Sequence, residues 1–295
     1  MSSMASNDSA FKQKLQRKAP YILVAAASLL IYETYLLQKS FLALYQIYLN
    51  IIQNAGPEGV SAHAYMWFTS ETFGEVGLIL RFAGALFFVT FAVALLRRKP
   101  SLTFLKWGVL LEAIQYLFLI PFITQWVVFS GLAARLTIIS FSLQILLITP
   151  TMLMLYLRLK RPQVSQTAVL RASAVSAVAF MFAMWIKHFL FNLYALPIDF
   201  SSPVLTVGFA NSAVTLLVSA LILTAVFLPL FRGKSTTFSF RGAGAALIVT
   251  GLYFVVYLAI AVVNMGYQSF LFLTELWMIS LIIAGAGFLL DGYSK

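Results

Sequence analysis

The segment MFAMWIKHFLFNLYALPID, residues 181–199, carries Lys187 and His188 inside an otherwise apolar run. An ammonium group placed in hydrocarbon costs at least ~2.5–3.5 kcal/mol on insertion scales. Lys187 therefore needs an acidic partner, water or a short route to the membrane surface. Apolar runs of similar length recur along the whole chain, and this recurrence predicts the fold.

The composition is that of a membrane protein. Of the 295 residues, 61% are hydrophobic and 10% are charged, whereas soluble domains carry roughly 25% charged residues. Runs of ~20 apolar residues are long enough to cross a ~30 Å hydrocarbon core as helices. We therefore expect an all-α integral membrane protein that crosses the cell membrane several times, with the lipid bilayer as its surroundings. The chain has no cysteine, which excludes disulfides and thiolate metal sites.

The apolar runs predict eight transmembrane helices, which cover residues 20–52, 73–96, 104–127, 132–157, 172–196, 204–231, 242–263 and 270–290. Residues 1–19 are expected to form a basic cytoplasmic tail before an uncleaved first helix. The first run is too long for one perpendicular span. Either this helix tilts and projects from the membrane, or a break near Lys39 and Ser40 turns its end into an interfacial helix.

Two further features mark the first half of the chain. Residues 53–72 are expected to form an outer loop, because Gly56, Pro57 and Gly59 interrupt helices. Whether this loop covers the outer surface as a lid is left open. Pro121 predicts a kink in the third helix.

The basic residues predict the orientation. The chain has 20 Lys and Arg residues and a net charge of +11. If both termini are cytoplasmic, most of these residues lie at the inner ends of the helices. Only Arg135 lies at an outer end, and Lys39, Arg81 and Lys187 fall within spans. This asymmetry follows the positive-inside rule, and clusters of this kind suit anionic lipid headgroups. We expect no nucleic-acid partner.

An internal duplication is a further hypothesis. The segments FAVALLRRKPSLTF (91–104) and TAVFLPLFRGKSTTF (224–238) both pass from an apolar helix through a basic turn to Ser, Thr and Phe. Two four-helix halves, residues 20–160 with the outer loop and 161–295, would then be related by an axis along the membrane normal. A separate pairing of the helix segments KAPYILVAAASLLIYETY and RASAVSAVAFMFAMWIKH sets Glu33 beside Lys187. The alternative is convergence, since basic turns between apolar helices resemble one another.

Polar side chains within the predicted spans concentrate toward the outer side. Six of them form the candidate ligand- or ion-binding site between the halves: Glu33, Glu75, Arg81, Lys187, Glu275 and Asn211. Ionisable groups in spans usually face a bundle interior or water. Alternatively they form structural ion pairs near helix ends, and Lys187 either pairs with Glu33 or extends to the outer interface. Among the acids, Glu112 is assigned to the inner half.

Three functions remain open at this stage. The first is a permease-like or solute-binding protein that takes a small polar or ionic solute, such as a zwitterion or an anion, or exchanges a proton. The second is a non-catalytic subunit whose intramembrane charges attach it to partner membrane subunits. The third is a membrane enzyme that acts on lipid-borne substrates, with His188 or a glutamate as general base.

Several chemistries lack support in the sequence. His63 and His188 are the two histidines and lie on different segments, which argues against haem ligation. No HExxH, GxSxG or P-loop pattern occurs. We therefore assign no catalytic residue, no metal site and no cofactor.

Overall fold

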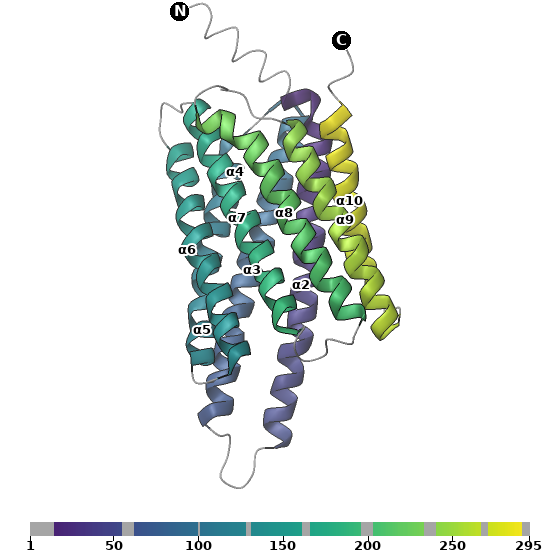
Figure 1. Cartoon of the computed structure of the whole chain (residues 1–295). Helices are drawn as coiled ribbons and strands as arrows, with labels where there is room; N and C mark the ends of the chain where they lie inside the picture. The colour runs from purple at the N-terminus through teal and green to yellow at the C-terminus, as the bar shows by residue number, and fades with distance from the viewer. Residues whose placement is uncertain are drawn as a thin grey trace, which may run out of the picture.

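The computed structural model describes residues 15–54, 62–99, 101–127, 131–160, 166–195, 203–232, 240–266 and 271–290. Within these ranges the chain is helical and has no strand (Figure 1). Eight helical segments there are long and apolar enough to cross a membrane. The predicted class, a multi-pass all-α membrane protein with eight spans, is confirmed.

The spans are packed in chain order. They consist of α2 (Ala19–Gln53), α3 (Ala62–Leu96), α4 (Leu102–Gln115) with the 3₁₀ turn η1 (Tyr116–Phe118) and α5 (Leu119–Val127), α6 (Leu132–Lys160), α7 (Gln166–Ala195), α8 (Pro203–Phe231), α9 (Phe240–Met265) and α10 (Leu271–Leu289). Each span contacts the next, and α10 contacts α2. The eight spans therefore form a closed ring of packed neighbours.

The first and last helices close the ring at one end of the bundle. The Lys18 ammonium donates a hydrogen bond to the Gly287 carbonyl oxygen and lies 5.5 Å from the centroid of the Tyr21 ring. Carbonyls in the last turn of a helix have no partner within that helix, so Lys18 satisfies one of them in α10. We call this end of the bundle the terminal end and the opposite end the distal end.

Of the two alternatives predicted for the first helix, the structure contains the continuous one, because α2 passes Lys39 and Ser40 without a break and ends at Gln53. The start of the next helix differs from the prediction. The expected outer loop over 53–72 is wrong for most of its length, because α3 already begins at Ala62. Gly56, Pro57 and Gly59 all precede α3, and no glycine or proline follows until Gly74. As a result α2 and α3 project beyond the other helices at the distal end (Figure 1).

The third span is interrupted where the sequence predicts a kink. Pro121 has no N–H, and its ring clashes with the carbonyl of the residue four positions earlier, Leu117. The chain responds with the 3₁₀ turn η1 around Leu117. This turn separates α4 from α5.

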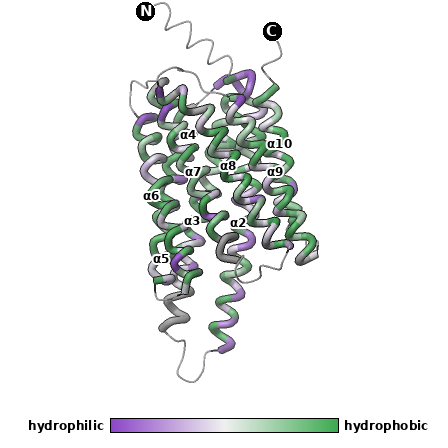
Figure 2. The backbone as a smooth tube through the Cα atoms, viewed as in Figure 1, coloured by the Kyte–Doolittle hydropathy of each residue, from purple (hydrophilic) through white to green (hydrophobic). Residues whose placement is uncertain are grey.

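The surface pattern of α8 is inverted relative to that of a soluble helix. Val214, Leu217 and Leu221 form a stripe in which each residue is at least 60% exposed. The opposite stripe, Ser212, Thr215 and Ser219, is buried. Apolar colour also predominates along the helices in Figure 2, while hydrophilic colour gathers near the terminal end and recurs on the distal part of α2 and near α5. Such exposure of large apolar side chains fits hydrocarbon surroundings.

A close backbone approach between α9 and α10 depends on two glycines. A Cβ at Gly244 would lie 2.6 Å from the Gly285 carbonyl oxygen, and a Cβ at Gly285 would lie 2.7 Å from the Gly244 carbonyl oxygen. Small residues permit such contacts between membrane helices, where van der Waals packing is a main source of attraction.

The Gly244→Ala substitution should therefore lower the free energy of unfolding by ~1–3 kcal/mol, the usual cost of overpacking. Gly74→Ala is the matched control, because a Cβ at Gly74 meets no atom within 4 Å. This control should be neutral or stabilising by up to ~1 kcal/mol, since alanine replaces glycine within a helix. Thermal unfolding of both variants in detergent measures the difference. Equal unfolding temperatures would contradict the role of the glycine contact.

Candidate functional site

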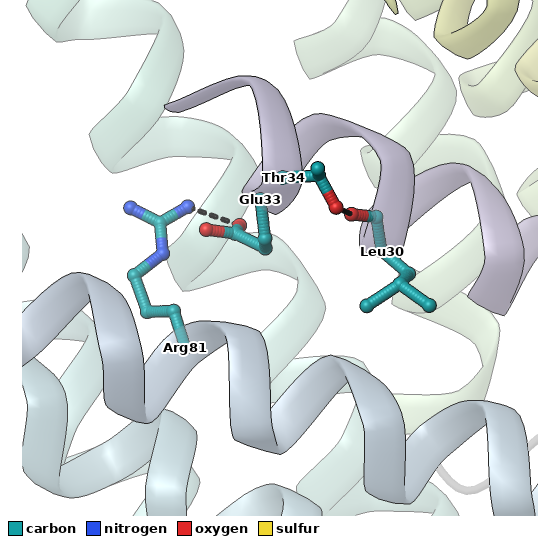
Figure 3. A network of polar contacts seen from close by, with 4 residues as sticks. All are labelled: Leu30, Glu33, Thr34 and Arg81. Carbon is teal, nitrogen blue, oxygen red and sulfur yellow. Dashed lines mark hydrogen bonds and ion pairs between the residues drawn. The ribbon is translucent and has the colours of Figure 1, made fainter. Parts of the chain in front are cut away.

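An ion pair connects the first two spans. Arg81 Nη2 on α3 lies 2.6 Å from Glu33 Oε1 on α2, and the two side chains are 12% and 0% exposed. Figure 3 shows the two side chains pointing toward each other from neighbouring helices. The adjacent Thr34 hydroxyl instead donates to the Leu30 carbonyl oxygen of its own helix, at 2.7 Å. Of the two neighbours Glu33 and Thr34, Glu33 is therefore the one that contacts α3.

A second carboxylate faces the same arginine. Glu112 on α4 is buried and interacts electrostatically with both Arg81 and Glu33. Its Oε1 atom would lie 3.4 Å from a Cβ at Gly84, which places this carboxylate against α3 one turn from Arg81. Within the described chain Glu112 Oε1 has no hydrogen-bond partner. Arg81 thus interacts electrostatically with two buried acids, Glu33 and Glu112, and forms an ion pair with Glu33.

A cavity of about 270 Å³ lies beside this cluster. Its lining comes from α2, α3, α6 and α7 and from the interrupted third span, and it includes Arg81, Lys187 and Glu71. Glu33 and Glu112 do not line it. Because a helix rises 1.5 Å per residue, the cavity extends about 15 Å along α3 between Glu71 and Arg81. It therefore runs from the distal part of the bundle toward its middle.

Lys187 is the second cation of the cavity. Its ammonium lies 5.1 Å from the centroid of the Phe141 ring on α6, a distance at which a cation is attracted by the face of the ring. The charge that acts on it most strongly is the like charge of Arg81. Across the described residues Lys187 forms no ion pair with an acid. Glu33 is paired with Arg81 instead, so the sequence hypothesis of a Glu33–Lys187 pair is not what the structure contains.

The other cavity walls combine amides, phenols, a hydroxyl and aromatic rings. Their polar groups come from Gln115 at the end of α4, Tyr116 in η1 and Gln144 in α6, and from Tyr32 and Ser40 of α2. The Gln144 Nε2 also donates to the Ser140 carbonyl oxygen at 3.2 Å. Apolar surface is supplied by residues that include Phe118, Phe122, Phe141 and Met184. The cavity wall can thus contact the apolar part of a ligand, while Arg81 and Lys187 contact its acidic group.

Three predicted site residues, Glu75, Asn211 and Glu275, neither line this cavity nor form an ion pair with Arg81. Glu75 is buried in α3 and accepts a hydrogen bond from the Ser40 hydroxyl of α2. Asn211 on α8 donates from Nδ2 to the Tyr253 carbonyl oxygen of α9 at 3.5 Å. Glu275 is half-buried on α10 and does not line the cavity. The structure therefore brings together Glu33, Arg81 and Lys187 of the six predicted residues.

His188 takes part in aromatic packing on the other side of α7. Its ring centroid lies 5.9 Å from that of Trp185 and 5.7 Å from that of Tyr253. The same cluster continues through Phe254, whose ring centroid lies 4.1 Å from that of Trp277. Neighbouring positions on a helix differ by about 100°, so Lys187 faces the cavity while His188 faces the aromatic cluster.

Sequence reasoning missed Gln144, Phe141 and Tyr116, and placed Glu112 too far from the other charges. A sequence signal for Glu112 exists, because antiparallel helices joined by a short turn bring residues at similar distances from the turn close together. Gly84 and Gly108 contact across α3 and α4 in this way, since a Cβ at Gly84 would lie 3.4 Å from the Gly108 carbonyl oxygen. Gln144 is the one amide side chain of α6 and carries the same signal as the predicted site residues, a polar group within an apolar span, whereas no sequence pattern distinguishes Phe141 from other residues of α6.

The Glu33→Gln substitution should lower the free energy of unfolding by ~3 kcal/mol or more, because it leaves the Arg81 charge without its direct partner in a dry interior. Exchange of both residues in Glu33→Gln/Arg81→Met removes both charges and should cost less than the single change. Arg135→Gln, at an exposed arginine, is the control and should stay within ~0.5 kcal/mol. Thermal unfolding in detergent gives all three values, and a double variant less stable than Glu33→Gln would contradict the pairing.

Comparison with known proteins identifies no relative. No protein-family model, no curated protein and no solved structure matches the chain. The features that bear on function are therefore the cavity, its cations Arg81 and Lys187, and the buried acids Glu33 and Glu112 that interact with Arg81.

Proposed function

We propose that this chain is a permease-like membrane protein that binds a small organic anion between Arg81 and Lys187. The observation that carries the proposal is the ammonium of Lys187, which faces a cavity and has no acidic partner among the described residues. A buried charge is stable only when it is paired or solvated. An anion in the cavity supplies the missing counter-charge.

The ligand is a small carboxylate with an apolar body. The cavity of about 270 Å³ is slightly smaller than the ~300–1,000 Å³ typical of sites for drug-sized ligands. Arginine binds carboxylates with two parallel hydrogen bonds, and lysine adds a point charge. Phe118, Phe122 and Phe141 provide apolar contact in the same cavity.

Transport rather than simple binding is favoured by the position of the site. Arg81 lies near the middle of the apolar segment Phe68–Leu96, where a charge is most costly and usually functional. The wall also contains η1, the interruption of the third span. Irregular backbone at membrane depth occurs where it lines a cavity, and interrupted helices form the substrate sites of many transporters.

The proposal is tested with benzoate and its uncharged analogue benzamide. Purified protein should bind benzoate more tightly than benzamide, as measured by isothermal titration calorimetry in detergent. Lys187→Met should weaken benzoate binding roughly 10- to 150-fold, because hydrogen bonds to charged groups contribute ~1.5–3 kcal/mol. Benzamide binding should change little, since it has no charge to pair with Lys187.

Lys39→Met is the matched control, because Lys39 is an exposed lysine of α2 that does not line the cavity. This variant should bind benzoate like the wild type. Vesicles reconstituted with wild-type protein should accumulate radiolabelled benzoate, and Lys187→Met vesicles should not. Equal uptake by both proteins, or equal affinity for benzoate and benzamide, would overturn the proposed site.

A further inference from the structure

A second cavity lies at the terminal end of the bundle, between the start of α2 and the end of α3. Its volume is about 450 Å³, which falls within the ~300–1,000 Å³ typical of ligand sites. Two arginines line it, Arg17 just before α2 and Arg98 just after α3. It shares no lining residue with the cavity beside Arg81. We call this second cavity the terminal pocket.

Arg98 has a backbone conformation that arginine rarely adopts. Its φ angle is 58°, and among the described residues every other positive φ belongs to glycine. The Arg98 N–H donates to the Leu95 carbonyl oxygen at 3.0 Å, and the Lys99 N–H donates to the Ala94 carbonyl oxygen at 2.9 Å. These two bonds form a helix-ending motif in which glycine is the usual residue at the position of Arg98. The chain thus places a cationic side chain where glycine would be less strained.

The basic residues near the terminal pocket differ in what they contact. Lys18, next to Arg17, is buried and donates a hydrogen bond to α10. Of the three consecutive basic residues after α3, Arg97, Arg98 and Lys99, it is Arg98 that lines the pocket. Arg17 and Arg98 are exposed, and neither forms an ion pair with an acid in the part of the chain that the structure describes. Two cations therefore converge on one pocket, where an anion can contact both.

The position of the terminal pocket points to a lipid as the source of that anion. Leu96 also lines the pocket, ends the apolar segment Phe68–Leu96 and is 46% exposed. The pocket therefore extends from exposed apolar surface to charged groups, as a phospholipid extends from its acyl chains to its headgroup. Basic pockets between membrane helices bind anionic headgroups, and arginine binds phosphate through two parallel hydrogen bonds.

We propose that the terminal pocket binds the phosphate of one anionic phospholipid between Arg17 and Arg98. The lipid contacts the start of α2 and the end of α3, the two helices that the Arg81–Glu33 ion pair connects further along the bundle. A ligand that binds only the folded protein stabilises it. The bound lipid therefore stabilises the packing of α2 against α3 at the terminal end.

Lipid binding is measured by native mass spectrometry of the full-length protein in detergent, which resolves each bound lipid by its mass. Phosphatidylglycerol is the anionic probe. Phosphatidylcholine, whose phosphate carries a cationic choline group, is the comparison. Wild type should bind one phosphatidylglycerol at least ~10-fold more tightly than phosphatidylcholine. Arg17→Gln and Arg98→Gly should each weaken phosphatidylglycerol binding roughly 10- to 150-fold, the effect of losing a hydrogen bond to a charged group.

Arg97→Gln is the matched control, because Arg97 is an exposed arginine next to Arg98 that does not line the terminal pocket. This variant should bind phosphatidylglycerol like the wild type. Arg98→Gly should also unfold at a higher temperature than the wild type in lipid-free detergent, because glycine adopts a positive φ without strain. Weaker lipid binding by a more stable protein separates the loss of the side chain from a loss of folding.

Three results would overturn the proposal. Equal weakening by Arg97→Gln and Arg98→Gly would attribute lipid binding to the general surface charge and not to the terminal pocket. Equal affinity of the wild type for the two lipids would remove the preference for an anionic headgroup. Displacement of bound phosphatidylglycerol by an equimolar amount of glycerol phosphate would assign the pocket to a soluble phosphate and not to a lipid.

Discussion

A buried arginine in hydrocarbon must be neutralised, and the arrangement around Arg81 follows from this constraint. Glu33 reaches it from α2 at 2.6 Å, and Glu112 faces it from α4. The three helices that carry these groups are consecutive spans of the ring. Opposite charges that are expensive to separate in a low-dielectric interior thereby stabilise the orientation in which the first three spans face one another.

The interior of the bundle contains two regions of different chemistry. On one side, α7 to α10 are joined by aromatic packing, in which Trp185 and Tyr253 meet at 4.5 Å between ring centroids. On the other side, α7 faces α3 and α6 across the cavity that contains Arg81 and Lys187. Lys187 and His188 are adjacent in the chain but belong to different regions, one polar and one aromatic.

The interruption of the third span follows from the backbone chemistry of proline and lies in the wall of the cavity. Pro121 removes a hydrogen-bond donor, and the 3₁₀ turn Tyr116–Phe118 results. Tyr116 and Phe118 both line the cavity. The proline-linked interruption thus lies in the cavity wall, where this span contributes both polar and aromatic side chains.

The sequence by itself determined the membrane class, the eight spans and the helix break near Pro121, because apolar length, breaker residues and missing backbone donors act locally. It also identified Glu33, Arg81 and Lys187 as side chains that need partners, since a charge in hydrocarbon is costly wherever it points. Only the tertiary structure decided which partners they have. Arg81 pairs with Glu33 and interacts with Glu112, while Lys187 lies against Phe141. Pairing depends on how neighbouring helices rotate about their axes, and side-chain packing over the whole ring sets that rotation.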